Sequence, residues 1–177
     1  MTICKYILIV IRSIPPQIYY LSLFVFCVGL VVFVGFKGLK KGLNYSLNLL
    51  LLEYYFIVIC STNIYRSPQG DRKFDFTPFW SYRQPDLIIE NIMNVVAFIP
   101  IGFLLGLGFK KLSWWNALYV GIMLSLPIEF MQLLFRKGFC EFDDVFHNVL
   151  GCMIGYSLFL LATSLVQRTS LKMLKNL

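Results

Sequence analysis

Charged residues are scarce in this sequence. Asp, Glu, Lys and Arg make up 14% of its 177 residues, whereas a soluble domain contains roughly 25%. Hydrophobic residues make up 58%, aromatic residues 17%, and the mean hydropathy is +0.72. So little charge cannot cover the surface of a water-soluble domain of this size, which excludes an ordinary soluble enzyme or binding module. The composition instead predicts one compact domain embedded in a membrane.

Residue patterns that mark metal, redox or nucleic-acid sites are also missing. The five cysteines are scattered and form no C-x-x-C pair, so neither a zinc site nor a redox motif is expected. Cys60 and Cys140 are expected on the same side of the membrane, which permits a disulfide without requiring one. The net charge of +7 forms no basic stripe, so nucleic acid is not expected as a partner, and no cofactor is predicted.

The N-terminus lacks a convincing cleavable signal peptide. Its apolar patch, Ile7 to Ile11, is too short to cross a membrane, and Arg12 and the Pro15–Pro16 pair end it. We therefore expect residues 1–17 to form an interfacial segment along the membrane surface.

What the sequence does contain is a series of apolar stretches close to the about 20 residues that a membrane-crossing helix needs. They predict an all-α, polytopic membrane helical bundle of about five transmembrane helices. The expected spans are residues 18–36, 43–64, 87–109, 114–135 and 145–166. We divide the chain accordingly into two helices in 18–64, an outer loop in 65–86, a core of three helices in 87–167 and a basic tail in 168–177.

The basic residues predict how these spans are oriented. Five spans place the two termini on opposite sides, and eight basic residues with no acid then share the side of the C-terminal tail. The other side also carries eight basic residues, but they are mixed with acids over longer segments. The density of positive charge in the short links therefore predicts a multi-pass protein with a cytoplasmic C-terminus.

The last two spans carry polar residues that are unusual for membrane-crossing sequence. Glu129, Gln132 and Arg136 are spaced at i, i+3 and i+7, on one helical face. Asp144 and Asn148 are spaced at i and i+4 and share a second face. An unpaired acid or carboxamide is costly inside a bilayer. These residues therefore either satisfy one another and hold the helices in register, or form a polar cavity for a ligand.

In the expected topology both faces meet Asn94 of the third span in the outer half of the membrane. If the cavity binds a ligand, Arg136 is the candidate contact for an anion, because guanidinium matches phosphate or carboxylate at two points. Glu129 is buried enough to act as a proton donor or acceptor. Asp143 and Asp144, together with Glu141, have the oxygen ligands that divalent cations prefer, but acids clustered in a short loop are more often only solvated, and no metal is predicted.

Several residues inside the spans are interpreted through packing. Gly102-x-x-x-Gly106 and Gly151-x-x-x-Gly155 are small-xxx-small patterns that permit close helix approach. Glu53 stands alone in the second span and either pairs across helices or faces the cavity. Pro100 and Pro127 predict bends in the third and fourth spans.

The order and spacing of these residues resemble the VanZ-like family of bacterial integral membrane proteins over about Phe74 to Phe159. The resemblance is carried by FDFTPFWSY, by NVVAFIPIGF from Asn94 to Phe103, by Ser125 with Glu129 and Gln132, by Arg136 with Gly138, and by Asp143, Asp144, Asn148, Gly151 and Gly155. His147 departs from the family pattern, in which a small or aliphatic residue is usual. We interpret this one histidine as packed or interfacial rather than catalytic.

The resemblance implies a role at the cell envelope, in the bacterial cytoplasmic (inner) membrane. The founding member of the family is associated with decreased susceptibility to teicoplanin, a glycopeptide antibiotic that binds peptidoglycan precursors. The resemblance therefore supplies a location and a class of phenotype but no reaction.

We accordingly expect a protein that engages a membrane lipid or a lipid-linked glycan headgroup at the outer leaflet and affects glycopeptide susceptibility. The expected ligand-binding residues are Asn94, Glu129, Gln132, Arg136, Asp143, Asp144 and Asn148. Two alternatives stay open: a membrane enzyme acting on a lipid-linked envelope precursor, with Glu129 or Asp144 as acid or base, and a non-catalytic assembly partner. No oligomeric state is predicted.

Overall fold

Long helices build almost all of the part of the chain that the structure describes. The computed structural model describes residues 12, 14–59, 74–109 and 112–175. Five of its helices are long and apolar enough to cross a membrane. They are α2 (Pro16–Lys37), α3 (Leu39–Ile59), α4 (Pro85–Gly108), α5 (Trp114–Phe135) and α6 (Phe142–Lys175), joined by a 3-10 helix η2 (Trp80–Arg83) and two short strands, β1 (Phe74–Asp75) and β2 (Cys140–Glu141).

The expected all-helical architecture with five apolar spans is confirmed, with differences at several helix ends; the second helix, for example, begins at Leu39 rather than at residue 43. The fourth span has the predicted bounds, but the fifth helix begins three residues before Val145 and continues through most of the predicted tail. Asp143 and Asp144 therefore lie in the first turn of α6, where acidic side chains favour a helix start. The predicted N-terminal segment up to residue 11, the end of the second span and residues 65–73 of the outer loop lie outside the described residues.

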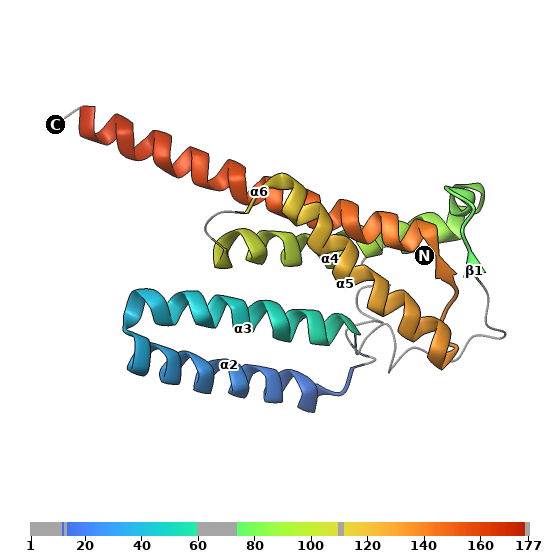
Figure 1. Ribbon diagram of the computed structural model, residues 1–177, viewed down its shortest axis with the longest axis horizontal. Helices are drawn as coiled ribbons and strands as arrows, with labels where there is room; N and C mark the ends of the chain where they lie inside the picture. Colours follow the sequence, from blue (N-terminus) through green and yellow to red (C-terminus); the bar gives the residue numbers. More distant parts are fainter. Residues whose placement is uncertain (1–11, 13, 60–73, 110–111, 176–177) are drawn as a thin grey trace.

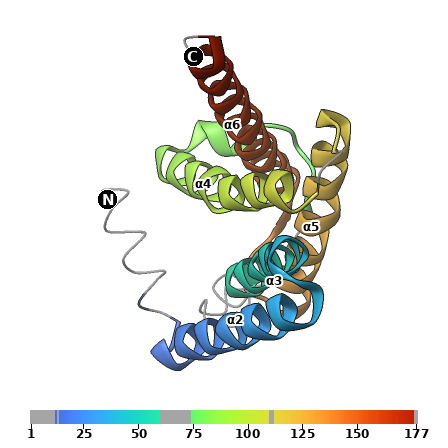
Figure 2. The same ribbon diagram turned by 90° about the vertical axis from the view of Figure 1, so that its left-hand side faces the viewer.

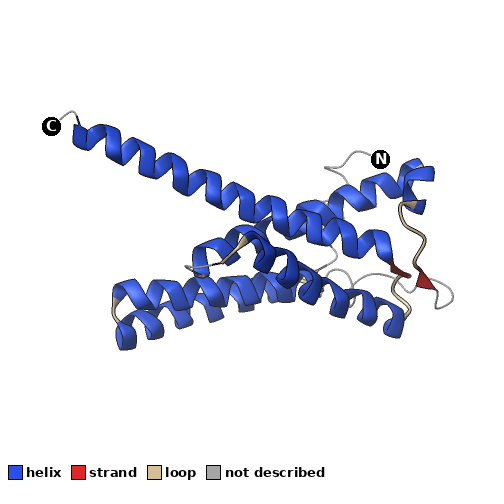
Figure 3. Cartoon of the chain, turned by 45° about the horizontal axis from the view of Figure 1, so that its top comes forward, coloured by secondary structure: helices blue, strands red, loops and turns tan. Residues whose placement is uncertain are grey.

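The helices form a hairpin and a three-helix core that lie side by side. Figure 1 shows α2 and α3 as an antiparallel pair below α4 and α6, with α5 crossing the view diagonally. Gly38 makes the turn of the hairpin with φ 74°, which favours glycine. Figure 2 shows the same layers end-on, and Figure 3 shows α6 projecting beyond the other helices towards the C-terminus.

Two ends of the bundle are used below as landmarks. The strand end is where α4 begins, α5 ends and α6 begins, beside β1 and β2 (Figures 1 and 3). The turn end is the opposite one, with the turn at Gly38, the end of α4 and the start of α5. The basic residues of the short links, among them Lys37 and Lys41, belong to the turn end.

Glycines allow α4 and α6 to pack closely, as the small-xxx-small patterns predict. These two helices make the most extensive helix–helix contact of the described chain. A Cβ atom on Gly102 would overlap the carbonyl oxygen of Cys152, and one on Gly151 or Gly155 would overlap a backbone carbonyl of α4. The absence of side chains at these positions therefore sets the distance between the helices that carry most of the polar cluster.

Polar groups inside the other spans also find partners. Ser22 of α2 donates to Glu53 Oε2 at 2.9 Å, so Glu53 pairs across the hairpin. Its second carboxylate oxygen is buried with no hydrogen bond from the described residues. Tyr54 and Tyr55 of α3 donate to the carbonyl oxygens of Ala97 (3.0 Å) and Leu124 (2.6 Å), on α4 and α5.

Candidate functional site

Polar side chains gather at the strand end of the bundle, where α4, α5, α6 and η2 meet. Most of the buried polar residues of the described chain lie here: Ser81, Asn91, Ser125, Glu129, Gln132, Asp143, His147 and Asn148. They come from segments that are apolar on their remaining faces. The site therefore exists only because the helices bring these faces together.

The carboxylate of Asp143 is enclosed by the turn that precedes α4. Asp143 is fully buried and accepts hydrogen bonds from the backbone N–H of Phe79 (2.6 Å) and of Ser81 (3.0 Å) and from the Ser81 hydroxyl (2.5 Å). Phe79 adopts a left-handed backbone, φ 59°, which helps aim its N–H at the carboxylate. Asn91 of α4 donates to Ser81 Oγ at 2.8 Å and completes the ring of contacts. We call this group the Asp143 cradle.

His147 extends the cradle by one helical turn. Its Nδ1 lies 2.5 Å from the carbonyl oxygen of Asp143, and its Nε2 lies 2.8 Å from the Tyr82 hydroxyl. A carbonyl oxygen only accepts, so the ring proton belongs on Nδ1, and Nε2 accepts from Tyr82. Both ring nitrogens are thus occupied and the residue is buried, in agreement with the interpretation of His147 as a packed residue.

A second group of polar side chains lies between the first turn of α6 and its neighbours. Asn94 of α4 donates to Asp144 Oδ1 at 2.7 Å, and Asn148 donates to the Ser125 hydroxyl of α5 at 2.9 Å. Three helices are therefore tied together by carboxamides. The structure brings Asn94, Asp144 and Asn148 to one end of the bundle, as the sequence analysis expected.

Two further buried residues at this end of the bundle, Glu129 and Gln132, come from α5. Glu129 is 1% exposed, and its Oε2 accepts the backbone N–H of Glu141 at 3.4 Å. Gln132, one turn later, is also buried, and its Oε1 has no hydrogen-bond partner among the described residues. A buried acceptor without a donor is costly, so this atom is suited to receive a hydrogen bond from a ligand.

Arg136 does not continue the face of Glu129 and Gln132. The last residue of α5 is Phe135, and Arg136 forms the C-cap with a left-handed backbone, φ 56°. Its side chain is exposed. The predicted i, i+3, i+7 face is therefore wrong at its last member, because the chain reverses direction towards β2 at this point.

The acidic residues of the strand end raise the proton affinity of Glu141. Parallel pairing of β1 with β2 places Asp75 opposite Glu141. Burial, followed by the charges of Asp144, Asp75, Glu90 and Asp143, raises the pKa of Glu141 to about 7. Burial and the neighbouring carboxylates also raise the pKa of the Cys140 thiol, which stays protonated. Among the described residues, no group of three or more His, Cys, Asp and Glu side chains is placed to hold a metal ion.

Some members of the site were missed from the sequence. Ser81 and Tyr82 lie in the aromatic segment FDFTPFWSY, and their roles depend on a turn that has no helical or strand periodicity. Asn91 shares a face of α4 with Asn94 at a spacing of i and i+3, which was the available signal. The contribution of Asp75 follows only from the pairing of two strands of two residues each.

The site thus contains a closed part and an open part. In the closed part, the Asp143 cradle, the polar groups that hold the turn in place form hydrogen bonds with one another, which fits a structural role. In the open part, the buried Oε1 atom of Gln132 has no hydrogen-bond partner among the described residues. An acceptor of this kind suits a ligand that carries a hydroxyl or N–H donor.

Comparison with known proteins agrees with the motifs. Protein VanZ of Enterococcus faecium is 33% identical over 88 residues, which are 50% of this chain and 53% of that protein, so the chain spans about half the length of this curated relative. No solved structure matches. The sequence model of the VanZ/LLP1 family matches residues 18–163, which include all of the candidate site. Since this match covers more than half of the chain, the protein is a multi-pass membrane protein that belongs to the VanZ/LLP1 family.

Proposed function

We propose that this protein binds the headgroup of a lipid-linked glycan or glycolipid at the outer leaflet of the bacterial cytoplasmic membrane. Binding there would affect the susceptibility of the cell to glycopeptides such as teicoplanin, the phenotype to which VanZ is linked. The observation that carries the proposal is the cluster of polar side chains at one end of the bundle, where the carboxylates of Glu129 and Asp144 lie on neighbouring helices and the buried Oε1 atom of Gln132 has no hydrogen-bond partner among the described residues.

The chemistry of these acceptors favours sugar over phosphate as the group that enters the site. A sugar ring presents several hydroxyl donors, which match the carboxylates of Glu129 and Asp144 and the Oε1 atom of Gln132. A phosphate would meet negative charge in the same place. The exposed guanidinium of Arg136 at the end of α5 is the candidate contact for the phosphate or other anionic group of the same headgroup.

In this proposal the strand end faces the cell exterior and the C-terminus is cytoplasmic. The short basic links at the turn end, which contain no acid, support this orientation. The headgroup then reaches the site from the outer leaflet, where envelope precursors are exposed to glycopeptides. Asn94 and Asn148 hold the helices around the bound group, and Asp143 shapes the turn beside it.

An enzymatic function on the same kind of lipid is the second candidate. The pKa of Glu141, raised to about 7 by burial and the surrounding carboxylates, favours it because the cluster keeps an exchangeable proton at neutral pH. Glu129 or Asp144 would then act as the acid or base. In the third candidate, a non-catalytic assembly partner, the polar residues serve only to hold the helices together.

Glycopeptide susceptibility of a sensitive bacterium that expresses the protein tests the proposal. We would compare wild type, Glu129→Gln and Arg136→Ala, with Glu53→Gln as a matched carboxylate-to-amide control away from the site, and measure membrane abundance for each. Protection by wild type and by Glu53→Gln, with loss in the two site variants at equal abundance, is the expected result. Loss of abundance in the site variants would favour the assembly role, and no protection by wild type would contradict the resistance part of the proposal.

Binding separates the first two candidates. Purified wild type is expected to retain a lipid-linked glycan extracted from bacterial membranes, detected by mass spectrometry. If Glu129→Gln retains this lipid as well as wild type does and yet fails to protect cells, catalysis by Glu129 is favoured over simple binding. If wild type retains no such lipid, headgroup binding is contradicted.

A further inference from the structure

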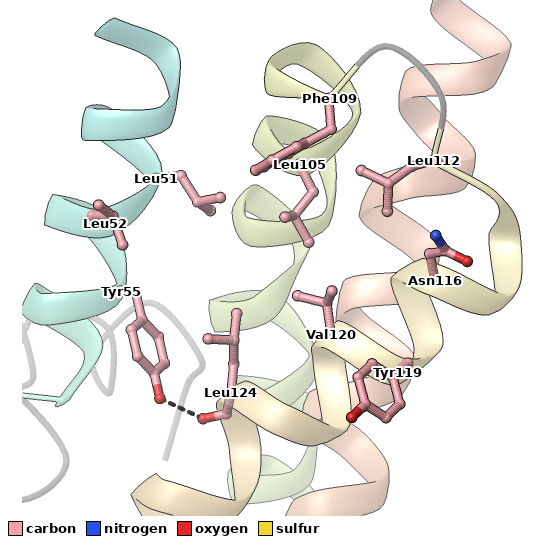
Figure 4. Close-up of a pocket in the computed structure, with 10 residues that line it drawn as sticks. All are labelled: Leu51, Leu52, Tyr55, Leu105, Phe109, Leu112, Asn116, Tyr119, Val120 and Leu124. Atoms are coloured by element: carbon pink, nitrogen blue, oxygen red, sulfur yellow. Dashed lines mark hydrogen bonds between the residues drawn. The ribbon is translucent and has the colours of Figure 1, made fainter. Parts of the chain in front are cut away.

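An apolar groove opens between α3 and α5, near the turn end and away from the polar site. Its volume is about 520 Å³, within the range of about 300–1,000 Å³ that is usual for ligand pockets. Figure 4 shows Leu51, Leu105 and Val120 projecting into it from α3, α4 and α5. Almost every other lining residue is also aliphatic or aromatic, so a ligand in the groove is held by burial of apolar surface rather than by hydrogen bonds.

The length of the groove matches one leaflet of a bilayer. On α5 its lining extends from Asn116 to Leu124, a rise of about 12 Å at 1.5 Å per residue. One leaflet supplies about half of the 30 Å hydrocarbon thickness. The hydrogen bond from Tyr55 to the Leu124 carbonyl crosses from α3 to α5 and closes the groove at its inner end (Figure 4). A chain that enters from the membrane surface therefore runs to the middle of the bilayer and stops.

The mouth of the groove lies where a phosphate is favoured. Trp114 and Trp115, both exposed, begin α5 beside the mouth and are residues typical of the membrane–water interface. The turn end also carries exposed Lys37 and Lys41 at the α2–α3 turn. These positive charges and the N-terminus of α5 belong to the same end of the bundle, so both favour a negative group on this side of the membrane.

We propose that the groove binds one acyl chain of an anionic diacyl phospholipid, such as phosphatidylglycerol, from the leaflet at the turn end. The chain fills the space between α3 and α5, which are otherwise linked through α4 and the Tyr55–Leu124 bond. The lipid thereby joins the α2–α3 hairpin to the three-helix core. This site lies at the other end of the bundle from the proposed headgroup site, so each proposal stands or fails separately.

Native mass spectrometry of the full chain in a non-ionic detergent tests the proposal. Phosphatidylglycerol and phosphatidylcholine with identical acyl chains are added in turn, and the number and apparent affinity of retained lipids are measured. Wild type is expected to retain one phosphatidylglycerol and to bind phosphatidylcholine about tenfold more weakly, because the basic turn end favours an anionic headgroup.

Two variants fill the groove, and a third controls for them. Val120→Trp places an indole inside the groove, and Leu52→Trp does the same from a residue that is 65% exposed and hence tolerant of change. Met123→Trp puts the same side chain on α5 outside the groove. Both groove variants are expected to bind phosphatidylglycerol about tenfold more weakly than wild type and Met123→Trp, since a few methylene groups lose their burial.

Two results would overturn the proposal. One is equal retention of phosphatidylglycerol by wild type and by the well-folded Leu52→Trp variant, which would mean that the groove is not the site. The other is equal binding of the two phospholipids by wild type, which would contradict selection of an anionic headgroup. Neither result bears on the headgroup site at the strand end.

Discussion

Tyr55 donates its hydroxyl hydrogen to the carbonyl oxygen of Leu124 at 2.6 Å, and Leu124 lies three residues before Pro127 inside α5. Tyr54 likewise donates its hydroxyl hydrogen to the carbonyl oxygen of Ala97 at 3.0 Å, and Ala97 lies three residues before Pro100 inside α4. A proline inside a helix lacks an N–H, so the carbonyl four residues earlier loses its helical donor and the ring disturbs the preceding turn. The carbonyls that the two tyrosines bind lie one residue later in that same turn. Two adjacent tyrosines of α3 therefore add hydrogen bonds from a neighbouring helix at the turns that precede both prolines.

Replacement of Tyr55 by Phe should destabilise the protein by about 1 kcal/mol, the usual net value of such a hydrogen bond. The cost should be smaller when Pro127 is also replaced by Ala, because without the proline ring the turn that contains Leu124 can close its own backbone hydrogen bonds. Unfolding in mixed detergent micelles measures both values in a double-mutant cycle. Tyr119→Phe is the matched control, since this tyrosine is exposed and has no hydrogen bond among the described contacts. An equal cost of Tyr55→Phe with and without Pro127 would contradict the explanation.

The Asp143 cradle predicts that Asp143→Asn lowers the amount of folded protein in the membrane. An amide keeps the shape but presents an N–H where three donors already converge, so at least one buried donor loses its acceptor, at about 1–3 kcal/mol. Membrane abundance and thermal stability in detergent report the loss. Asp75→Asn is the matched substitution, because among the described residues Asp75 accepts only an exposed turn bond from the backbone N–H of Thr77. If both variants behave alike, the cradle is not what holds this end together.

The raised pKa of Glu141 predicts stability that falls as the pH rises. The folded protein binds this proton with a pKa of about 7, whereas the ordinary value is 4.5. The contribution is therefore fully present below pH 4.5 and is lost as the pH rises through about 7. In Glu141→Gln this part of the pH dependence should disappear, so that the curve of melting temperature against pH becomes flatter between these values.

Asp75→Asn provides a graded comparison for Glu141. It removes one of the charges that raise the pKa of Glu141, so the loss of stability should be smaller and complete at a lower pH than in wild type. A Glu141→Gln variant with an unchanged pH dependence would show that other carboxylates carry the effect.

The close approach of α4 and α6 predicts strong sensitivity at their glycines. Gly151→Ala places a methyl group on the backbone of α4 at Val95. Overpacking of this kind costs about 1–3 kcal/mol or more when backbone atoms cannot move aside. Gly35→Ala is the control, because a methyl group there meets nothing within 4 Å. Tolerance of Gly151→Ala at wild-type stability would mean that the two helices separate at little cost.

Much of the fold follows from local pattern in the sequence. Apolar length alone predicted five spans, and the fourth agrees with α5 at both ends, because Ser113 caps its start and Arg136 its finish. Charge and spacing also pointed to Asn94, Glu129, Gln132, Asp144 and Asn148 as one group. Whether a side chain favours lipid or a polar partner is a property of the residue itself, since an unpaired acid is costly anywhere inside a bilayer.

What each polar residue does was decided only by tertiary structure. Asp143 and Asp144 are neighbours of identical chemistry, yet the first is enclosed by Phe79 and Ser81 and the second meets Asn94. The start of α6 at Phe142 turns their side chains to different sides, and residues more than 60 positions away determine the contacts of Asp143. Local sequence determines which groups must be satisfied in a membrane, whereas their partners depend on how the helices pack, because hydrogen bonds are short and directional.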